Sequence, residues 1–312
     1  MSDATDLDTN TADLAGALHP AASGKGVDAR QSDDRGIDPR VVNAQPRGHG
    51  STKWLVAVAA VFVQLAAGSP ASPQPTDRLD TIDRELIARL GDGIIGEPIE
   101  PIDPEKLVAA MARPHSAEFR VLEGPQKGKT VQLSVRKEDG GSHANASGLT
   151  PSWVLEVPGV ITEHLVEDAE GLSASMLVIG TSGVSSTYRP PEPMLLRGIA
   201  AGKSKSYVMD VRVHPLAHPE QTKYRGQIRT TYSNRGSYRI QTPAGAFNGT
   251  VVRSDYQGKL GPATMNDVDI RIYSPTVGLI AIVTHNRLHA ALLLNRDKHI
   301  TLLVEKLPPD AR

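Results

Sequence analysis

Apolar side chains recur at every second position from Ala117 onward, and this period of two constrains the fold more than any other feature of the chain. The clearest runs are Phe119 and Val121, then Val131, Leu133 and Val135, then Tyr207, Met209, Val211 and Val213, then Val268, Ile270 and Ile272. Such alternation is typical of strands that bury one face. The intervening residues, such as Asp210, Arg212, Asp269 and Arg271, are expected to point into solvent. A sheet with one wet face favours antiparallel pairing.

Turn residues separate these runs at short intervals. The clearest cases are Asp139-Gly140-Gly141, Asn234-Arg235-Gly236 and Thr242-Pro243-Ala244-Gly245. Their spacing predicts about ten to twelve strands between Ala117 and Leu307. We therefore expect residues 116–312 to form a mainly β (α+β) domain, built as one curved antiparallel sheet or an open half-barrel.

Residues 72–115 are expected to form a linker and one or two short helices, packed on the sheet or across its mouth. Leu79, Ile82, Leu86 and Leu90 follow helical spacing, with Thr76 or Asp77 as the cap and Gly91 as the stop. A second helix is predicted from Pro104 to about Ala112, because Asp103 can cap it and a proline suits its first turn.

The N-terminal quarter of the chain carries a targeting signal. Residues 1–53 show neither the period of two of a strand nor the period of 3.6 of a helix, and we predict that they are disordered or a mis-assigned extension. In the second case, translation starts near Val41 or Val42. Residues 54–71 read as a signal peptide, because an apolar run follows Arg47 and Lys53 and precedes small residues. The run is shorter than the roughly twenty residues that span a bilayer, so we expect cleavage, after Ala71 first and Gly68 second. An inner-membrane anchor through residues 54–68 and a buried core helix remain alternatives. The expected location is periplasmic or secreted.

Composition excludes several classes of function. The net charge of -1 provides no field that would attract nucleic acid, so no nucleic-acid partner is expected, and contact with a membrane is expected only through the signal segment. The chain has no cysteine, which excludes disulfides, thiolate metal sites and a cysteine nucleophile. Aromatic residues are 4% of the chain, too few for extensive stacking platforms.

Two motifs come close to known catalytic signatures and fall short. Residues 124–130 approach a phosphate-binding loop, but the first glycine is missing and a strand follows, so we interpret them as a hairpin turn. Residues 180–184 lack the final glycine of a nucleophile elbow and are interpreted as a loop.

The histidines form no recognisable metal motif. His214 with His218, and His285 with His289, have four-residue spacing, which on extended chain places side chains roughly 13 Å apart. His164, next to Glu163, has no second histidine at the zinc-protease spacing, and its segment is expected to be exposed and charged. We therefore predict no catalytic, cofactor-binding or metal-binding residues and no cofactor.

Three segments between about residues 190 and 305 resemble the TapB-like family of exported bacterial β proteins of unknown function. They are the Tyr238–Phe247 strand with its Pro-Ala-Gly turn, the Ile272–Ile280 turn, and the Pro191–Leu196 segment followed by Gly202. The chain departs from the family pattern at Thr276, where a glycine is expected, and lacks an expected tryptophan nearby. The resemblance implies a half-barrel related to periplasmic lipoprotein carriers, which bind acyl chains on the concave face, and implies no catalytic residues.

We expect an exported cell-envelope protein whose concave face, lined by Val, Ile, Leu and Met, holds a lipid, another apolar ligand or an envelope protein partner. One alternative is a hydrolase or metal-dependent enzyme with a site assembled from scattered polar residues such as Asp255, His285 and His289. The other is a purely structural interaction module.

Overall fold

The computed structural model describes residues 76–124, 126–138, 152–290 and 294–309, which all belong to one compact unit. The predicted disordered segment, the signal segment and the turn at Asp139-Gly140-Gly141 lie outside these residues. The described strands are β1 (Ile95–Ile99), β2 (His115–Glu123), β3 (Thr130–Lys137), β4 (Trp153–Val157), β5 (Ile161–Glu167), β6 (Gly171–Ile179), β7 (Val184–Leu196), β8 (Ser204–Pro215), β9 (Tyr224–Thr242), β10 (Gly245–Leu260), β11 (Ala263–Ser274), β12 (Gly278–Ala290) and β13 (Leu294–Lys306).

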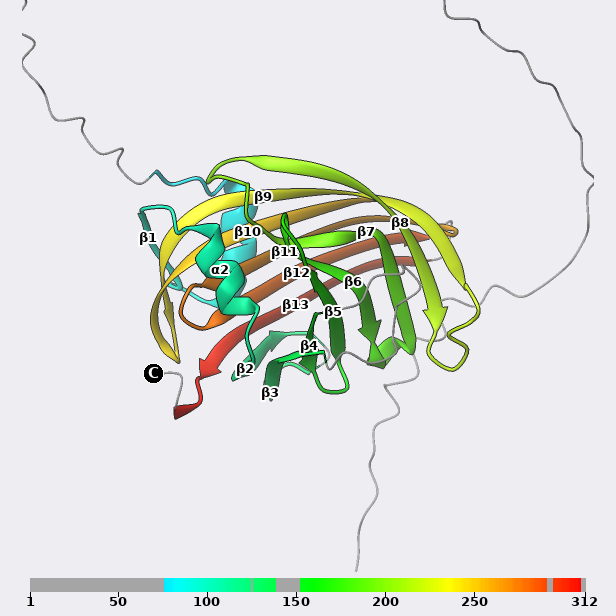
Figure 1. Ribbon diagram of the computed structural model, residues 1–312, viewed down its shortest axis with the longest axis horizontal. Coiled ribbons are helices and arrows are strands. Elements are labelled where there is room, and N and C mark those ends of the chain that lie inside the picture. The colour runs from blue at the N-terminus through cyan, green and yellow to red at the C-terminus, as the bar shows by residue number, and fades with distance from the viewer. Residues whose placement is uncertain (1–75, 125, 139–151, 291–293, 310–312) are drawn as a thin grey trace, which may run out of the picture. The chain divides into compact units, whose positions relative to one another are not determined.

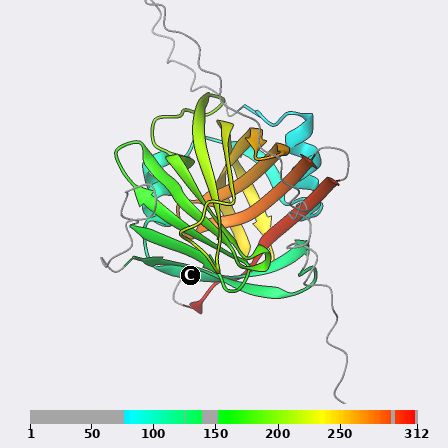
Figure 2. The same ribbon diagram turned by 90° about the vertical axis from the view of Figure 1, so that its right-hand side faces the viewer.

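Twelve of these strands close into a barrel. Each strand from β2 to β8 and from β9 to β12 pairs antiparallel with the next in sequence, and β13 pairs with β2. The remaining edges meet because β8 pairs with the first half of β9, from Val213↔Tyr224 to Ser204↔Ser233. Figure 1 shows the long strands lying side by side, and Figure 2 shows them surrounding the interior. The predicted antiparallel pairing and strand number are confirmed, whereas the open half-barrel is wrong.

The length of β9 explains both the closure and the one extra strand. This strand spans 19 residues, so its first half pairs with β8 while its second half is left for another partner. Strand β1 fills that place, with Ile95 opposite Ile240. Residues 95–99, which the sequence placed in a linker, therefore extend the sheet beyond the barrel.

The first helix packs on the outside of the barrel wall. Helix α1 (Thr81–Ile87) runs into the short 3-10 helix η2 (Ala88–Leu90), and its cap is Asp80 rather than Thr76 or Asp77. Asp80 Oδ1 accepts a hydrogen bond of 2.9 Å from the Asp83 backbone N–H, and Asp83 Oδ2 accepts one of 3.0 Å from the Asp80 N–H. This reciprocal capping box satisfies two backbone donors at the start of the helix.

Ion pairs hold α1 against β9 and β10. The Asp83 carboxylate is fully buried and lies 2.6 Å from the Arg235 guanidinium and 3.2 Å from the Arg253 guanidinium. Helix α1 also contacts β11 and β12. It thereby covers an apolar row on the outer face of the barrel that includes Ile270 and Ile272, both fully buried.

The second helix lies across one end of the barrel. Helix α2 (Pro104–Met111) begins at the cap Asp103, as the sequence predicts, and contacts both β7 and β12. These strands stand on opposite sides of the ring. Its own side chains Leu107, Val108 and Met111 are buried, so α2 covers this end of the barrel with an apolar face.

Turn chemistry is correctly predicted at one site and not at another. Thr242 to Gly245 forms the hairpin between β9 and β10, where the Thr242 hydroxyl donates to the Gly245 carbonyl. The predicted turn at Asn234-Arg235-Gly236 is wrong, because these residues continue β9 through a bulge opposite Thr250 and Val252. Gly236 has a φ of 98°, which a bulge can use as readily as a turn.

Candidate functional site

Charged residues on β11 point into the barrel, not into solvent. In the antiparallel register Asp269 lies opposite Thr284, and Arg271 opposite Ile282, all on the inner face. The prediction that Asp269 and Arg271 face solvent is therefore wrong. The physical reason for the difference is that helix α1 covers the outer face of β11. The apolar residues of this strand therefore face outward, against the helix. Asp210 and Arg212 on β8 are exposed, as predicted.

The barrel encloses a cavity of about 360 Å³. This volume lies within the range of about 300–1,000 Å³ that is usual for small-molecule sites. Its walls are mainly aliphatic and sulfur-containing side chains from many strands, among them Val160, Ile161, Ile179, Met209, Ile228 and Leu260. The predicted lining of Val, Ile, Leu and Met is correct for these walls, but they enclose a cavity instead of forming an open concave face.

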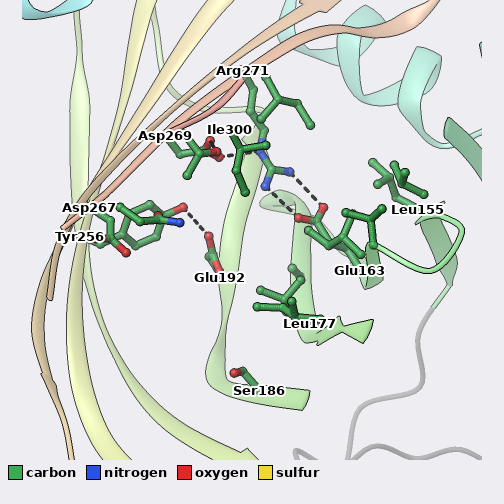
Figure 3. Close-up of a pocket in the computed structure, with 18 of the residues that line it drawn as sticks. Leu155, Glu163, Leu177, Ser186, Glu192, Tyr256, Asp267, Asp269, Arg271 and Ile300 are labelled. Atoms are coloured by element: carbon green, nitrogen blue, oxygen red, sulfur yellow. Dashed lines mark hydrogen bonds and ion pairs between the residues drawn. The ribbon is translucent and has the colours of Figure 1, made fainter. Parts of the chain in front are cut away.

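A buried ion-pair network lies on one side of this cavity (Figure 3). The Arg271 guanidinium donates to both oxygens of Glu163, at 3.0 and 2.8 Å, and its Nε donates to Asp269 Oδ2 at 2.7 Å. The other Asp269 oxygen accepts a 2.7 Å hydrogen bond from the Thr284 hydroxyl. The Glu163 side chain is 6% exposed and that of Arg271 14%, so water screens this network little. Glu163, predicted to lie in an exposed segment, is thus one of the most deeply buried charges.

Two further carboxyl groups, those of Glu192 and Asp267, line the same cavity. Glu192, on β7, accepts a short hydrogen bond from the Tyr256 hydroxyl on β10 (Figure 3). Burial in the apolar wall raises the pKa of Glu192 to about 7, and the bond from Tyr256 and the Arg271 charge offset only part of that effect. Burial also raises the pKa of Asp267 to about 6, although the Arg287 backbone N–H donates to it at 2.7 Å.

The charged groups lie toward the α2 end of the cavity, and the opposite end is mainly apolar, with Ser186 and Asn286 among its polar side chains. On β11 the order from the α2 end is Arg271, Asp269, Asp267 and then Met265 near the β10–β11 turn. Val160 and Leu260 lie at turns on that same side, away from α2. A ligand entering there would pass mainly apolar walls before it reached Glu192 or Arg271.

The two segments that come close to catalytic motifs, residues 124–130 and 180–184, lie at hairpin connections. Residues 124–130 connect β2 and β3, as predicted, with Gly124 and Gly128 at positive φ. Residues 180–184 include the short 3-10 helix η3 (Gly180–Ser182) between β6 and β7. Neither segment precedes a helix that could hold a phosphate or position a nucleophile.

Of the alternative enzyme site, the two residues whose side chains the structure describes, Asp255 and His285, lie two strands apart. His285 stacks on His299 on the outer face of the barrel, with ring centroids 4.0 Å apart. Asp255 lies on that face two strands away and binds Arg253 at 2.5 Å, while the His289 side chain lies outside the described part. His214 hydrogen-bonds the Gln221 carbonyl at 3.0 Å. Within the described residues no group of three or more His, Cys, Asp or Glu side chains is arranged to hold a metal ion.

Comparisons with known proteins give only remote similarity. No family model matches the chain, and no curated protein matches it. Among solved structures, the hypothetical lipoprotein YmcC from Escherichia coli has 12% identity and a TM-score of 0.35, covering 75% of this chain and 100% of that one. A candidate lipoprotein from Parabacteroides distasonis has 11% identity and a TM-score of 0.30, covering 63% of this chain and 95% of that one. A candidate exported protein with a YmcC-like fold from Bacteroides fragilis has 13% identity and a TM-score of 0.29, covering 63% and 96%.

Two of these neighbours are described as lipoproteins and one as an exported protein, and TM-scores this low carry no argument for this chain. The TapB-like resemblance stays a prediction from the sequence, because no family model supports it. Of the helices that the structure describes, none has both the length and the hydropathy to cross a bilayer.

Proposed function

We propose that this chain is an exported, noncatalytic binding protein that holds one small apolar or amphiphilic molecule inside its barrel. The observation that carries the proposal is the cavity of about 360 Å³, with aliphatic walls and a few polar groups gathered at depth. This combination is typical of ligand sites, where apolar contact provides affinity and a few polar groups fix orientation.

The distribution of charge along the barrel supports binding over a purely structural role. A buried ion pair is weak evidence of stability, since well-packed apolar residues commonly stabilise a core as much or more. Glu163, Asp269 and Arg271 line a cavity, where they can contact the polar end of a ligand.

The export half of the proposal rests on the signal-like residues 54–71. It places the mature protein in the periplasm or outside the cell, where apolar ligands need a carrier to cross water. The anchored form remains the alternative for this half alone.

Ligand binding is tested on the purified full-length chain by native mass spectrometry and by titration with Nile red, a neutral apolar dye. We expect a copurified small molecule or a saturable rise in dye fluorescence with one site per chain. The variant Ala174→Phe places a ring on the cavity wall, because Ala174 is buried and lines the cavity. It should weaken dye binding about tenfold or more, since filled space removes apolar contact area.

The matched control is Val208→Phe, which adds the same ring to a residue that is 49% exposed on the outer wall. Control and parent should bind the dye equally. Equal binding by Ala174→Phe, with its β circular dichroism intact, would place the dye elsewhere and contradict the proposal. A protein that carries no small molecule and binds no dye would instead favour the structural interaction module.

A further inference from the structure

The cavity holds more buried acid than buried base. Its lining includes five acidic residues, Glu123, Glu163, Glu192, Asp267 and Asp269, and a single guanidinium, that of Arg271. Of these acids, Glu123 forms an ion pair with Arg89 on the short helix η2. Arg271 is already shared, because Nε binds Asp269 and both terminal nitrogens bind Glu163. An incoming carboxylate or phosphate would therefore meet a cation that is neutralised and be repelled by the remaining acids.

Two polar groups near the network retain bonding capacity. Among the described residues Tyr256 is the one hydrogen-bond partner of Glu192, so the second Glu192 oxygen is available to a ligand. The Tyr273 hydroxyl is fully buried on the same inner row as Arg271, beyond it toward α2, and has no hydrogen-bond partner within the described residues. An unpartnered buried hydroxyl costs free energy, which a ligand or water that bonds to it would recover.

We propose that the ligand is an amphiphile with an apolar tail and a protonated amine head, and that the ammonium binds the Glu192 carboxylate deep in the barrel. The inference rests on the proposed binding function and specifies its ligand class. The tail then lies along the aliphatic walls toward Val160 and Leu260, and the ammonium supplies positive charge to the excess of acids. An ammonium buried against a carboxylate forms the stronger, charge-assisted type of hydrogen bond.

Amine binding should depend on pH through Glu192. The titratable and charged groups that face it are Tyr188, Tyr256, Asp267, Asp269, Arg271 and Glu163. Burial raises the pKa of Glu192 to about 7, and an ammonium beside it would lower that value again by favouring the charged form. Affinity for an amine should therefore rise between about pH 6 and about pH 8, and binding near pH 6 should release a proton.

Three probes of equal chain length separate head group from tail. Dodecylamine, dodecanol and dodecanoate are each used to displace Nile red from the full chain at about pH 8. We expect dodecylamine to bind tightest, roughly 10- to 100-fold more tightly than dodecanol, as one charge-assisted hydrogen bond predicts. Dodecanoate should bind more weakly than dodecanol.

The variant Glu192→Gln keeps the shape of the side chain and removes its charge. It should reduce the preference for dodecylamine over dodecanol to within about threefold, since no ammonium partner remains. The control Asp210→Asn removes one exposed negative charge from the outer wall and should keep the full preference. Circular dichroism of each variant shows whether the fold is retained.

The outcomes separate the two proposals. If the dye does not bind and nothing copurifies, the binding function itself fails. If the dye binds but none of the three probes displaces it, the amine inference is overturned while the binding function stands. If dodecanol binds but dodecylamine binds no tighter, or if dodecanoate binds best, the amine inference is overturned while the binding function stands. A full amine preference in Glu192→Gln also overturns it, because the ammonium would then lie elsewhere.

Discussion

Replacing Arg271 with methionine tests the buried network most directly. Arg271 is 14% exposed and makes three charge-assisted hydrogen bonds, two to Glu163 and one to Asp269. Methionine fills similar space with apolar atoms but leaves two carboxylates in a poorly hydrated wall. Removing one partner of a buried ion pair lowers the free energy of unfolding by about 3–5 kcal/mol. Because this variant leaves both Glu163 and Asp269 without their partner, we expect a loss near the upper end of this range.

The measurement is urea unfolding followed by far-ultraviolet circular dichroism at neutral pH. Folded domains commonly have only about 5–15 kcal/mol of stability, so the loss should lower the urea midpoint markedly. The control is the triple variant Arg271→Met, Glu163→Leu, Asp269→Asn, which removes the charges together. It should recover most of the loss, because an apolar replacement of a whole buried pair is often neutral or stabilising.

Two results would refute this reasoning. A single variant that loses less than about 1 kcal/mol would mean that the carboxylates are hydrated in the folded state and the site is wetter than its burial indicates. A triple variant no more stable than the single one would mean that Arg271 acts through packing and not through charge.

The remaining predictions concern the helix, the cavity acid and export. Asp83→Ala should cost about 3–5 kcal/mol in urea unfolding, because the fully buried Asp83 carboxylate balances Arg235 and Arg253. The control Glu97→Ala breaks only an exposed ion pair and should leave the urea midpoint unchanged. Equal losses of stability in the two variants would contradict this prediction. Glu192→Gln should raise the melting temperature relative to the parent at about pH 8 but not at about pH 5. The reason is that the folded pKa of Glu192, about 7, exceeds its ordinary value of 4.5, so the parent loses stability as pH rises between them. N-terminal sequencing of the exported product should begin at Ser72; a cytosolic, uncleaved chain would contradict export.

The period of two predicted strands and antiparallel pairing, and the spacing of the turns predicted about ten to twelve strands. Each of these follows from local geometry, because a strand exposes alternate residues to alternate faces whatever lies beyond it. Thr242 to Gly245 was predictable for the same reason, since proline and glycine restrict or permit backbone angles locally. The helix spanning Pro104 to Met111 was likewise readable from its cap and first turn.

Which face of each strand points inward is not a local property, and only the tertiary structure decided it. On β11 the residues Ile270 and Ile272 alternate with Asp269 and Arg271, and a helix on the outer wall makes the apolar row the outer one. Closure was decided in the same way, by long-range pairing of β8 with β9. The candidate site could therefore not be predicted from the sequence. Glu163, Glu192 and Arg271 come from three strands that are far apart in the sequence, and each of them alone looks like an ordinary surface charge. They become a site because the closed barrel removes them from water, and desolvation depends on every strand of the ring at once.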